Sequence, residues 1–287
     1  MNHEDNEQLE LLSHLLSERP FGQGVGSREQ MAGPKEPFDI SKGIQESSGS
    51  MSMHASPVPE IRPDVAREQR KGTPEVIFGE TKGTSQIVAM AQVLLAQTGR
   101  AVISRMPPEA LEAIQAAFRD YPMRVRGAAR AVVIYRPEYV RKNTGGHIGV
   151  ISAGTSDIPV AEEAVLIAEE MGCRVTCIYD VGVAGLHRLI EPLRDLLAHG
   201  ADAIIVAAGM DGALPSVVAG LVPIPVIGLP TSIGYGMGGK GVAALLSMLQ
   251  TCAPGLSVVN IDNGIGAGIT AALIANRVAQ AREHQSQ

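Results

Sequence analysis

The stretch that decides the fold is residues 201–230, ADAIIVAAGMDGALPSVVAGLVPIPVIGLP. Two short apolar runs within it, 201–209 and 225–230, are typical of buried β-strands, and the run between them, 213–221, has helical spacing. A strand, a helix and a second strand predict a βαβ unit with parallel strands. The glycine-rich turn at 209–212 would then lie at the carboxyl end of the first strand, where open α/β sheets bind ligands.

The same alternation extends in both directions along the chain. We expect further strands at 146–154, 174–182 and 256–262, and helices at 158–171, 186–199, 239–250 and 268–282. Strands that alternate with helices of this length predict an α/β fold with a doubly wound parallel sheet. The hydrophobic content of 45% with only 3% aromatic residues suits such a core of Ala, Val, Ile and Leu.

Two further regions precede this sheet. Residues 61–142 predict a small α/β domain, with strands at 75–78, 101–105 and 129–135 and helices at 84–99 and 107–118, the first of them capped by Thr84 or Ser85. Residues 1–60 are rich in Gly, Ser, Pro and Met and predict a flexible N-terminal arm, with one short amphipathic helix at 7–17. A catalytic domain at 143–287 completes the expected organisation.

Composition excludes several classes of protein. The net charge of −6 and the lack of a basic stripe argue against nucleic-acid binding, and no uninterrupted apolar stretch is long enough for a membrane span. The acidic start of the chain is unlike a secretory signal. Three cysteines form no disulfide framework, so we expect a cytoplasmic protein.

Polar residues follow the predicted strands at the edge where ligands bind. The first strand is followed by a turn that could hold a phosphate, or whose Ser156 or Asp157 could simply cap the next helix; the turn comprises Gly154, Thr155, Ser156 and Asp157. After the second strand, Arg188 could clamp an anion. Its neighbour His187 could be a general acid or base, or a solvated residue at a helix end.

Two of the later predicted strands are also followed by an aspartate, Asp211 and Asp262. Asp211 lies between two glycines, which suits either chemistry or a turn. The glycine loop at 230–240 could close over a ligand. Asp262 could ligate Mg²⁺ or, more simply, cap the last helix. Cys173 and Cys177 lack further metal ligands nearby, and we interpret both as core residues.

Taken together, the segments SAGTSD (152–157) and 200–230 resemble the aminoimidazole ribonucleotide carboxylase family of purine synthesis. The resemblance covers residues 146–283 and implies a flavodoxin-like fold, an octamer, and a ribonucleotide phosphate at the first turn. The segment after the second strand, DVGVAGLHRL (180–189), differs from the His-bearing segment of that family.

A more specific resemblance covers residues 62–283. The segments DVAREQRKGTPEVIFG (64–79), DVGVAGLHRL, GMDGALPSVV (209–218), PTSIGYG (230–236), TCAPG (251–255) and VVNIDNGIGAG (258–268) resemble the LarB family. This family implies a carboxylase/hydrolase that begins nickel-pincer nucleotide cofactor synthesis. Its substrates are nicotinic acid adenine dinucleotide, CO₂ as co-substrate, and water, and its products are pyridinium-3,5-biscarboxylic acid mononucleotide and AMP. No tightly bound cofactor is implied, although Mg²⁺ could take part.

The chemistry explains why such an enzyme needs a thiol. A pyridinium ring is too electron-poor to attack CO₂, but addition of a thiolate at carbon 4 makes carbon 5 nucleophilic. By the resemblance, Cys252 is the nucleophile, Asp211 the acid/base, and His187 acts near the phosphoanhydride. The implied substrate-binding residues are Gly154, Thr155, Ser156, Asp157, Arg188, Gly209, Asp262 and, from the first domain, Asp64, Arg67 and Arg70, with Glu75 beside them.

The sequence departs from the LarB pattern at one catalytic position, since the family usually carries Glu where this chain has Asp211. A carboxylate displaced by one CH₂ could slow proton transfer about 10²-fold. Two other functions therefore stay open: a purine-pathway carboxylase or mutase, and a non-catalytic nucleotide-binding module. The role of Cys252 also stays open, because a lone cysteine is more often a small buried hydrophobe.

Overall fold

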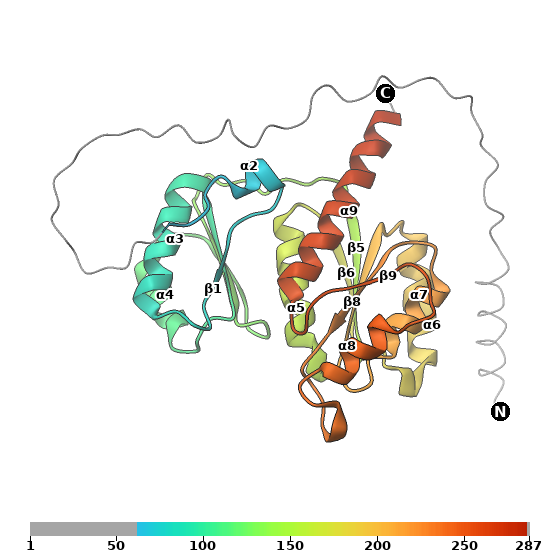
Figure 1. The fold of residues 1–287 in the computed structure, drawn as a ribbon. Coiled ribbons are helices and arrows are strands. Elements are labelled where there is room, and N and C mark those ends of the chain that lie inside the picture. The colour runs from blue at the N-terminus through green and yellow to red at the C-terminus, as the bar shows by residue number, and fades with distance from the viewer. Residues whose placement is uncertain (1–61, 286–287) are drawn as a thin grey trace, which may run out of the picture. The chain divides into compact units, whose positions relative to one another are not determined.

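The computed structural model describes residues 62–285. The predicted arm at 1–60, including the helix at 7–17, lies outside the described residues. Two sheets organise the rest of the chain, with strand orders β1-β2-β4-β3 and β6-β5-β7-β8-β9 (Figure 1). The α/β class and the flavodoxin-like doubly wound sheet are thereby confirmed, because all neighbouring strands of the second sheet are parallel and their order is the flavodoxin one.

The first sheet contains β1 (Val76–Phe78), β2 (Arg100–Ser104), β3 (Met123–Arg126) and β4 (Ala131–Tyr135). Its helices are α2 (Arg67–Lys71), α3 (Thr84–Thr98) and α4 (Ala110–Ala117). Strands β1 and β2 are parallel, whereas β4 is antiparallel to both β2 and β3. The sheet is therefore mixed.

Two local predictions for this first region are corrected. The N-cap of α3 is Gly83, and neither Thr84 nor Ser85 caps it with a side chain. Strand β3 was not expected, because its sequence MRVR is basic and only partly buried. As an edge strand it pairs on one side only, and its arginines form ion pairs with the next helix: Arg124 Nη2 lies 2.6 Å from Glu169 Oε2, and Arg126 Nη2 lies 2.7 Å from the same oxygen.

The second sheet contains β5 (His147–Ser152), β6 (Arg174–Ile178), β7 (Ala203–Ala208), β8 (Val226–Pro230) and β9 (Leu256–Val258). The α-helices that follow these strands are α5 (Ile158–Glu170), α6 (His187–Ala198), α7 (Leu214–Leu221), α8 (Val242–Leu249) and α9 (Gly264–Gln285). Single 3₁₀ turns, η2 (Thr155–Asp157), η3 (Val183–Gly185) and η4 (Gly236–Gly238), lie in three of the connections. Every crossover that we expected from 146 onward is present.

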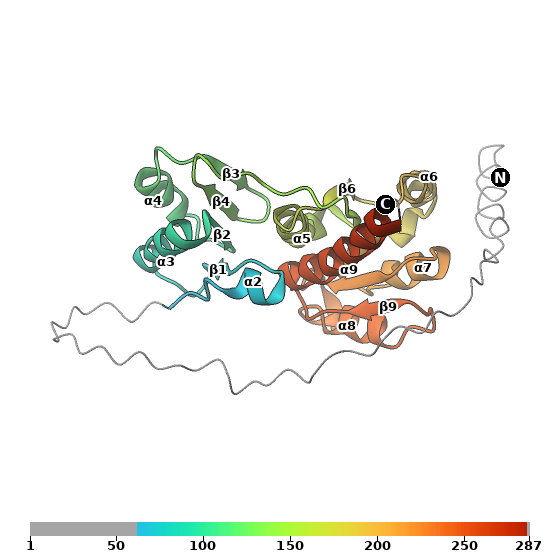
Figure 2. The same ribbon diagram turned by 90° about the horizontal axis from the view of Figure 1, so that it is seen from above.

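The helices divide between the two faces of the second sheet (Figure 2). One face packs on α5 and α9, and the other packs on α6, α7 and α8. Helix α9 is lined with small residues, and a Cβ on Gly268 would come within 2.5 Å of the Ala164 carbonyl oxygen. Glycine at this position lets α5 and α9 approach closely.

The cluster of buried side chains around α5 and α9 also receives Val76, Val102 and Val133 from the first sheet. Alternate residues of those strands, such as Ile77 and Ile103, point to the other face and pack with α3 and α4. Helices α5 and α9 therefore contribute to a core that both sheets share.

Candidate functional site

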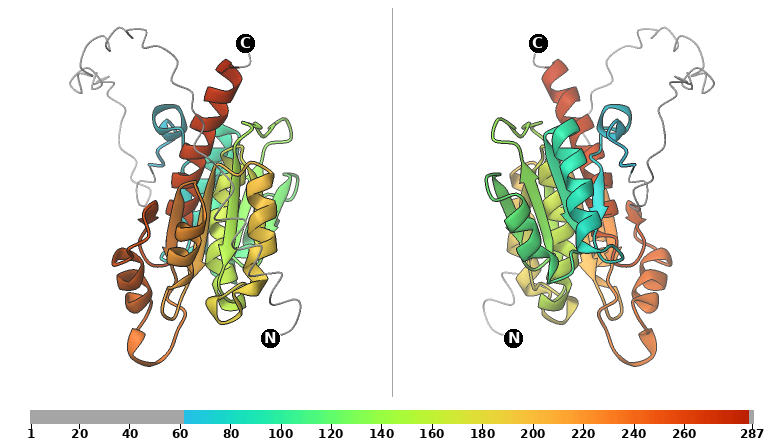
Figure 3. Two further views of the ribbon diagram at one scale, coloured as in Figure 1. Left: turned by 90° about the vertical axis from the view of Figure 1, so that its right-hand side faces the viewer. Right: turned by 90° about the vertical axis from the view of Figure 1, so that its left-hand side faces the viewer.

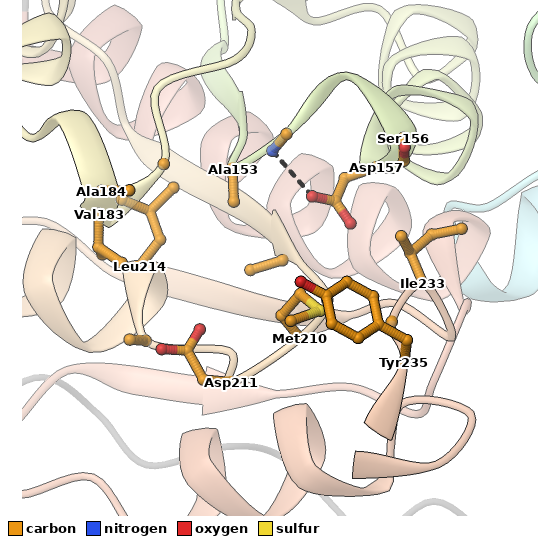
Figure 4. Close-up of a pocket in the computed structure, with 16 residues that line it drawn as sticks. Ala153, Ser156, Asp157, Val183, Ala184, Met210, Asp211, Leu214, Ile233 and Tyr235 are labelled. Atoms are coloured by element: carbon orange, nitrogen blue, oxygen red, sulfur yellow. Dashed lines mark hydrogen bonds between the residues drawn. The ribbon is translucent and has the colours of Figure 1, made fainter. Parts of the chain in front are cut away.

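A cavity of about 550 Å³ opens at the carboxyl edge of the second sheet (Figure 4). Four connections that follow β5, β6, β7 and β8 form its walls. The lining residues are Ala153, Gly154, Ser156, Asp157, Gly182, Val183, Ala184, Ala208, Gly209, Met210, Asp211, Ala213, Leu214, Ile233, Gly234 and Tyr235. Its position is the one that the strand pattern predicted, because carboxyl ends of parallel strands share one edge.

The turn after β5 is closed by Asp157. The Gly154 amide donates to Asp157 Oδ2 at 2.9 Å, and the Thr231 hydroxyl donates to Asp157 Oδ1 at 2.6 Å. Burial raises the pKa of the Asp157 carboxyl above its ordinary value, and the donors from Thr231, Gly154 and Gly209 oppose part of that rise. Asp157 thus fixes the turn, and no side-chain hydrogen bond caps the start of α5.

The connections after β7 and β8 are held against each other. The Met210 amide donates to the Ile233 carbonyl oxygen at 2.9 Å, and Met210 has a φ of 50°. Gly209 is required beside them, because a Cβ there would lie 2.7 Å from Thr231 Oγ1 and would overlap the Ile233 carbonyl oxygen. The wall of the cavity therefore depends on a residue without a side chain.

Asp211 is exposed, and its carboxylate lies across the cavity from Asp157 in the view of Figure 4. In the same view the Tyr235 ring and Met210 lie below Asp157 and to the right of Asp211. Tyr235 is 83% exposed, so its ring is open to a planar ligand. Sequence reasoning marked this glycine loop as a lid but missed Tyr235, although an aromatic side chain among glycines was a signal. Figure 3 shows the segment that carries η4, in orange, extended away from the sheet.

The structure brings some of the predicted site residues together and leaves others apart. Those that line the cavity are Gly154, Ser156, Asp157, Gly209 and Asp211. Thr155 lies within the same turn and is exposed. His187 and Arg188 begin α6 outside the cavity lining, and Arg188 Nη1 forms an exposed ion pair with Asp180 Oδ2 at 3.0 Å.

Asp262 follows β9 at the carboxyl edge but does not line the cavity. Its Oδ1 accepts a hydrogen bond of 2.7 Å from the Ser232 amide. The expected cap of the last helix is instead made by Asn263, whose Oδ1 accepts from the Gly266 amide at 2.9 Å. Among the residues described, no group of three or more His, Cys, Asp or Glu side chains is placed to hold a metal ion, and a role for Asp262 in binding Mg²⁺ stays a prediction.

The candidate residues of the first region form ion pairs with one another. Arg70 Nη2 lies 2.6 Å from Asp64 Oδ2, and Arg67 Nε lies 2.8 Å from Glu75 Oε2. Asp64 lies before the start of α2. None of these residues lines the described cavity.

Cys252 is exposed, in the connection between α8 and β9. This connection lies at the amino edge of the sheet, because the Val226 amide at the start of β8 donates to the Gly255 carbonyl oxygen at 3.0 Å. Strand β8 leads from there to the cavity, and its five residues make four steps of ~3.3 Å, about 13 Å in all. One chain therefore does not bring Cys252 to its own cavity.

The other two cysteines differ from each other. Cys173 is buried, as expected, and burial raises its pKa to about 11. Cys177 is exposed on β6, so the prediction that it packs in the core is wrong. Strand β6 is the edge strand of its sheet, where one side of a strand is open to solvent.

No helix within the described residues has the length and apolar character needed to cross a membrane.

Comparison with known proteins adds family information to this geometry. Residues 147–287 match the AIR carboxylase family, and residues 59–136 match the LarB/PurE-like N-terminal domain. An uncharacterized protein of Methanocaldococcus jannaschii is 42% identical over 220 residues, which is 75% of this chain and 84% of that protein.

Two ribonucleotide mutases are also similar to this chain. An N5-carboxyaminoimidazole ribonucleotide mutase of the same organism is 38% identical over 127 residues, 43% of this chain and 75% of the mutase. The mutase of Thermotoga maritima is 33% identical over 134 residues, which is 44% of this chain and 73% of that mutase.

Proposed function

Because the chain belongs to the LarB-like proteins, which join a LarB/PurE-like N-terminal domain to an AIR carboxylase domain, we propose that it carboxylates and hydrolyses nicotinic acid adenine dinucleotide. The family is that of carboxylases and mutases. The proposed products are pyridinium-3,5-biscarboxylic acid mononucleotide and AMP, for nickel-pincer cofactor synthesis. A cytoplasmic location, where thiols stay reduced, is part of the proposal.

The observation that carries the proposal is the exposure of Cys252. Free cysteine is among the most buried residue types and usually packs as a small hydrophobe. Cys252 follows the last turn of α8, yet it is Met248 of that helix, not the thiol, that fills the core. An exposed thiol in the TCAPG segment suits a nucleophile better than a packing residue.

The cavity offers what the rest of the reaction requires. Its walls are mostly apolar, and Tyr235 and Met210 can contact the flat pyridinium ring. The thiolate adds to ring carbon 4, and the resulting enamine-like carbon 5 attacks CO₂. Asp211 takes the proton from carbon 5, and expulsion of the thiolate restores the aromatic ring. Water then cleaves the phosphoanhydride, which releases AMP.

The separation of Cys252 from the cavity makes a second copy of the chain part of the proposal. The thiol must form a bond with a ring that lies at the opposite sheet edge of any one chain, so the partner subunit's Cys252 must reach the cavity. An apolar row suited to subunit contact precedes Cys252 on α8, where Val242, Leu246 and Leu249 are 50%, 56% and 62% exposed. A homo-oligomer, an octamer in the related carboxylases, meets this requirement.

Asp211 is the position where the proposal is most specific to this chain. We expect Asp211→Asn to lower turnover by about 10²-fold or more, since the base for carbon 5 is lost. Asp211→Glu restores the residue usual in the LarB family and should keep or raise turnover. If both substitutions lowered turnover equally, Asp211 would be a turn residue and not a base.

One incubation tests the proposal directly. The protein is mixed with nicotinic acid adenine dinucleotide and isotope-labelled bicarbonate, and the products are identified by mass. We expect AMP together with a labelled biscarboxylic mononucleotide, and neither product from Cys252→Ala. Dinucleotide binding without AMP release would support a non-catalytic nucleotide-binding module instead.

The similarity to the mutases favours one alternative enzyme. These mutases are named for N5-carboxyaminoimidazole ribonucleotide, so that compound belongs in the same assay. Turnover of that compound, with none of the dinucleotide, would replace the proposed function with a mutase.

A further inference from the structure

Arg105 connects the first sheet to the connections that build the cavity. It directly follows β2 and has a φ of 52°, which turns its side chain out of the strand. The guanidinium then contacts α5 and the turn after β9, both elements of the second sheet's domain.

Glu163 of α5 fixes the orientation of the guanidinium. Arg105 Nε donates to Glu163 Oε1 at 2.9 Å and Nη2 donates to Oε2 at 3.3 Å, an arrangement with two parallel hydrogen bonds. The Glu163 side chain is 5% exposed, and the buried Ser104 hydroxyl also donates to its Oε1, at 3.0 Å. A planar guanidinium held at two atoms has little freedom to rotate.

The same guanidinium donates to the backbone of the turn after β9. Arg105 Nη2 donates a hydrogen bond to the Asp262 carbonyl oxygen. Asp262 has a φ of 57°, which is uncommon for a residue with a side chain and needs support from its surroundings. Arg105 supplies that support from another sheet.

From Asp262 the contacts continue to the cavity. The Asp262 amide donates to the Pro230 carbonyl oxygen at 2.8 Å, and its Oδ1 accepts from the Ser232 amide at 2.7 Å. The residue before Ser232, Thr231, holds Asp157, and the residue after it, Ile233, holds Met210. Every residue from 230 to 233 therefore bonds either to the Asp262 turn or to a part of the cavity wall.

We propose that Arg105 is a positioning residue of the cavity: it holds the Asp262 turn, and through that turn it sets the place of the 231–235 segment that forms one wall. The first domain thereby takes part in the site without lining it. This inference concerns the geometry of the cavity and does not depend on which ligand the cavity binds.

Three variants separate positioning from simple stabilisation. Arg105→Ala leaves the buried Glu163 unpaired, so the protein could fail to fold. The double variant Arg105→Met with Glu163→Met replaces the ion pair by apolar side chains, which is often neutral for stability, but it lacks the donor to Asp262. Arg130→Met is the matched control, because Arg130 also has a positive φ, of 48°. Both arginines lie near Glu80, Arg105 Nη1 at 3.8 Å from Oε2 and Arg130 Nη2 at 3.9 Å from Oε1, but only Arg105 donates to Asp262.

Amide hydrogen exchange in the full chain measures the effect. We expect the amides of Ser232, Asp262 and Met210, whose hydrogen bonds join the 230–233 segment to its neighbours, to exchange roughly tenfold faster in the double variant, the factor for the loss of one hydrogen bond. Exchange in the strands of the second sheet should stay unchanged, as should all exchange in Arg130→Met. Wild-type exchange of the Ser232, Asp262 and Met210 amides in a folded double variant would overturn the proposal.

Kinetics give a second readout. If the dinucleotide is the substrate, the double variant should lose about 10- to 100-fold in kcat/KM, while Arg130→Met keeps the wild-type value. An inactive wild-type protein would refute the proposed function alone, because the exchange experiment would still decide the role of Arg105.

Discussion

A mixture of two inactive variants tests whether the site is built from two chains. One variant is Cys252→Ala, which keeps its cavity, and the other is Asp211→Asn, which keeps its thiol. Within one chain the connection that carries the thiol and the cavity lie at opposite ends of β8, a strand whose five residues span about 13 Å, four steps of ~3.3 Å. A carbon–sulfur bond cannot form across that distance, so activity requires the thiol of another chain.

The expected recovery follows from random assembly. When the two variants mix in equal amounts, a site is intact only if its cavity comes from the Cys252→Ala chain and its thiol from the Asp211→Asn chain. Roughly one quarter of the sites meet this condition in a symmetric oligomer. The mixture should therefore show up to about a quarter of the wild-type rate, while each variant alone shows almost none.

The assay is AMP release from nicotinic acid adenine dinucleotide after the two variants are unfolded together and refolded. Differently tagged chains, purified through both tags in turn, show that mixed oligomers have formed. If such oligomers stay inactive, the partner subunit's Cys252 does not serve the cavity, and the reasoning from the sheet edges is wrong.

Three further outcomes are expected. Alkylation at about pH 8 should modify the exposed Cys252 long before Cys173, whose pKa burial raises to about 11; mass analysis of peptides checks this, and equal rates would contradict the burial of Cys173. Gly209→Ala should lower the free energy of unfolding by about 1–3 kcal/mol and abolish ligand binding, because the new Cβ overlaps the Ile233 carbonyl oxygen. Calorimetry measures unfolding and dinucleotide binding, and unimpaired binding would contradict the role given to Gly209 in the cavity wall. Burial, aided by a neighbouring arginine, lowers the pKa of His147, so the folded state binds fewer protons than the unfolded one and stability falls as the pH drops below about 6.5. Thermal unfolding across this pH range should show a weaker loss of stability in His147→Gln than in the wild type. An identical loss would exclude this histidine as the cause.

The regular part of the fold could be predicted because its signals are local. Apolar runs and glycine turns specify each strand and helix from 146 onward, and parallel pairing follows from their alternation. Strand β3 could not be found this way, since its sequence MRVR has few apolar residues. Ion pairs with α5, formed across a distance in sequence, complete the environment of β3.

The candidate site was predicted in part for the same reason. Asp157 and Asp211 follow strands directly, so the rule of the carboxyl edge places them together. Cys252 precedes the strand predicted at 256–262, so the same rule puts it at the opposite, amino edge of a parallel sheet; the sequence analysis applied the rule only to residues that follow strands. The bond from Arg105 to the Asp262 turn joins residues 157 positions apart, and no local pattern marks it.

The shared packing around α5 and α9 has a consequence for cooperativity. Both helices bury side chains against two sheets at once, so neither sheet keeps a complete hydrophobic core when the other unfolds. Domains with separate hydrophobic cores can unfold in separate transitions, whereas domains that share a core unfold cooperatively. Residues 62–285 should therefore unfold in a single transition. A fragment that begins at 143 would expose to solvent the apolar side chains of α5 and α9 that pack on the first sheet, which destabilises it.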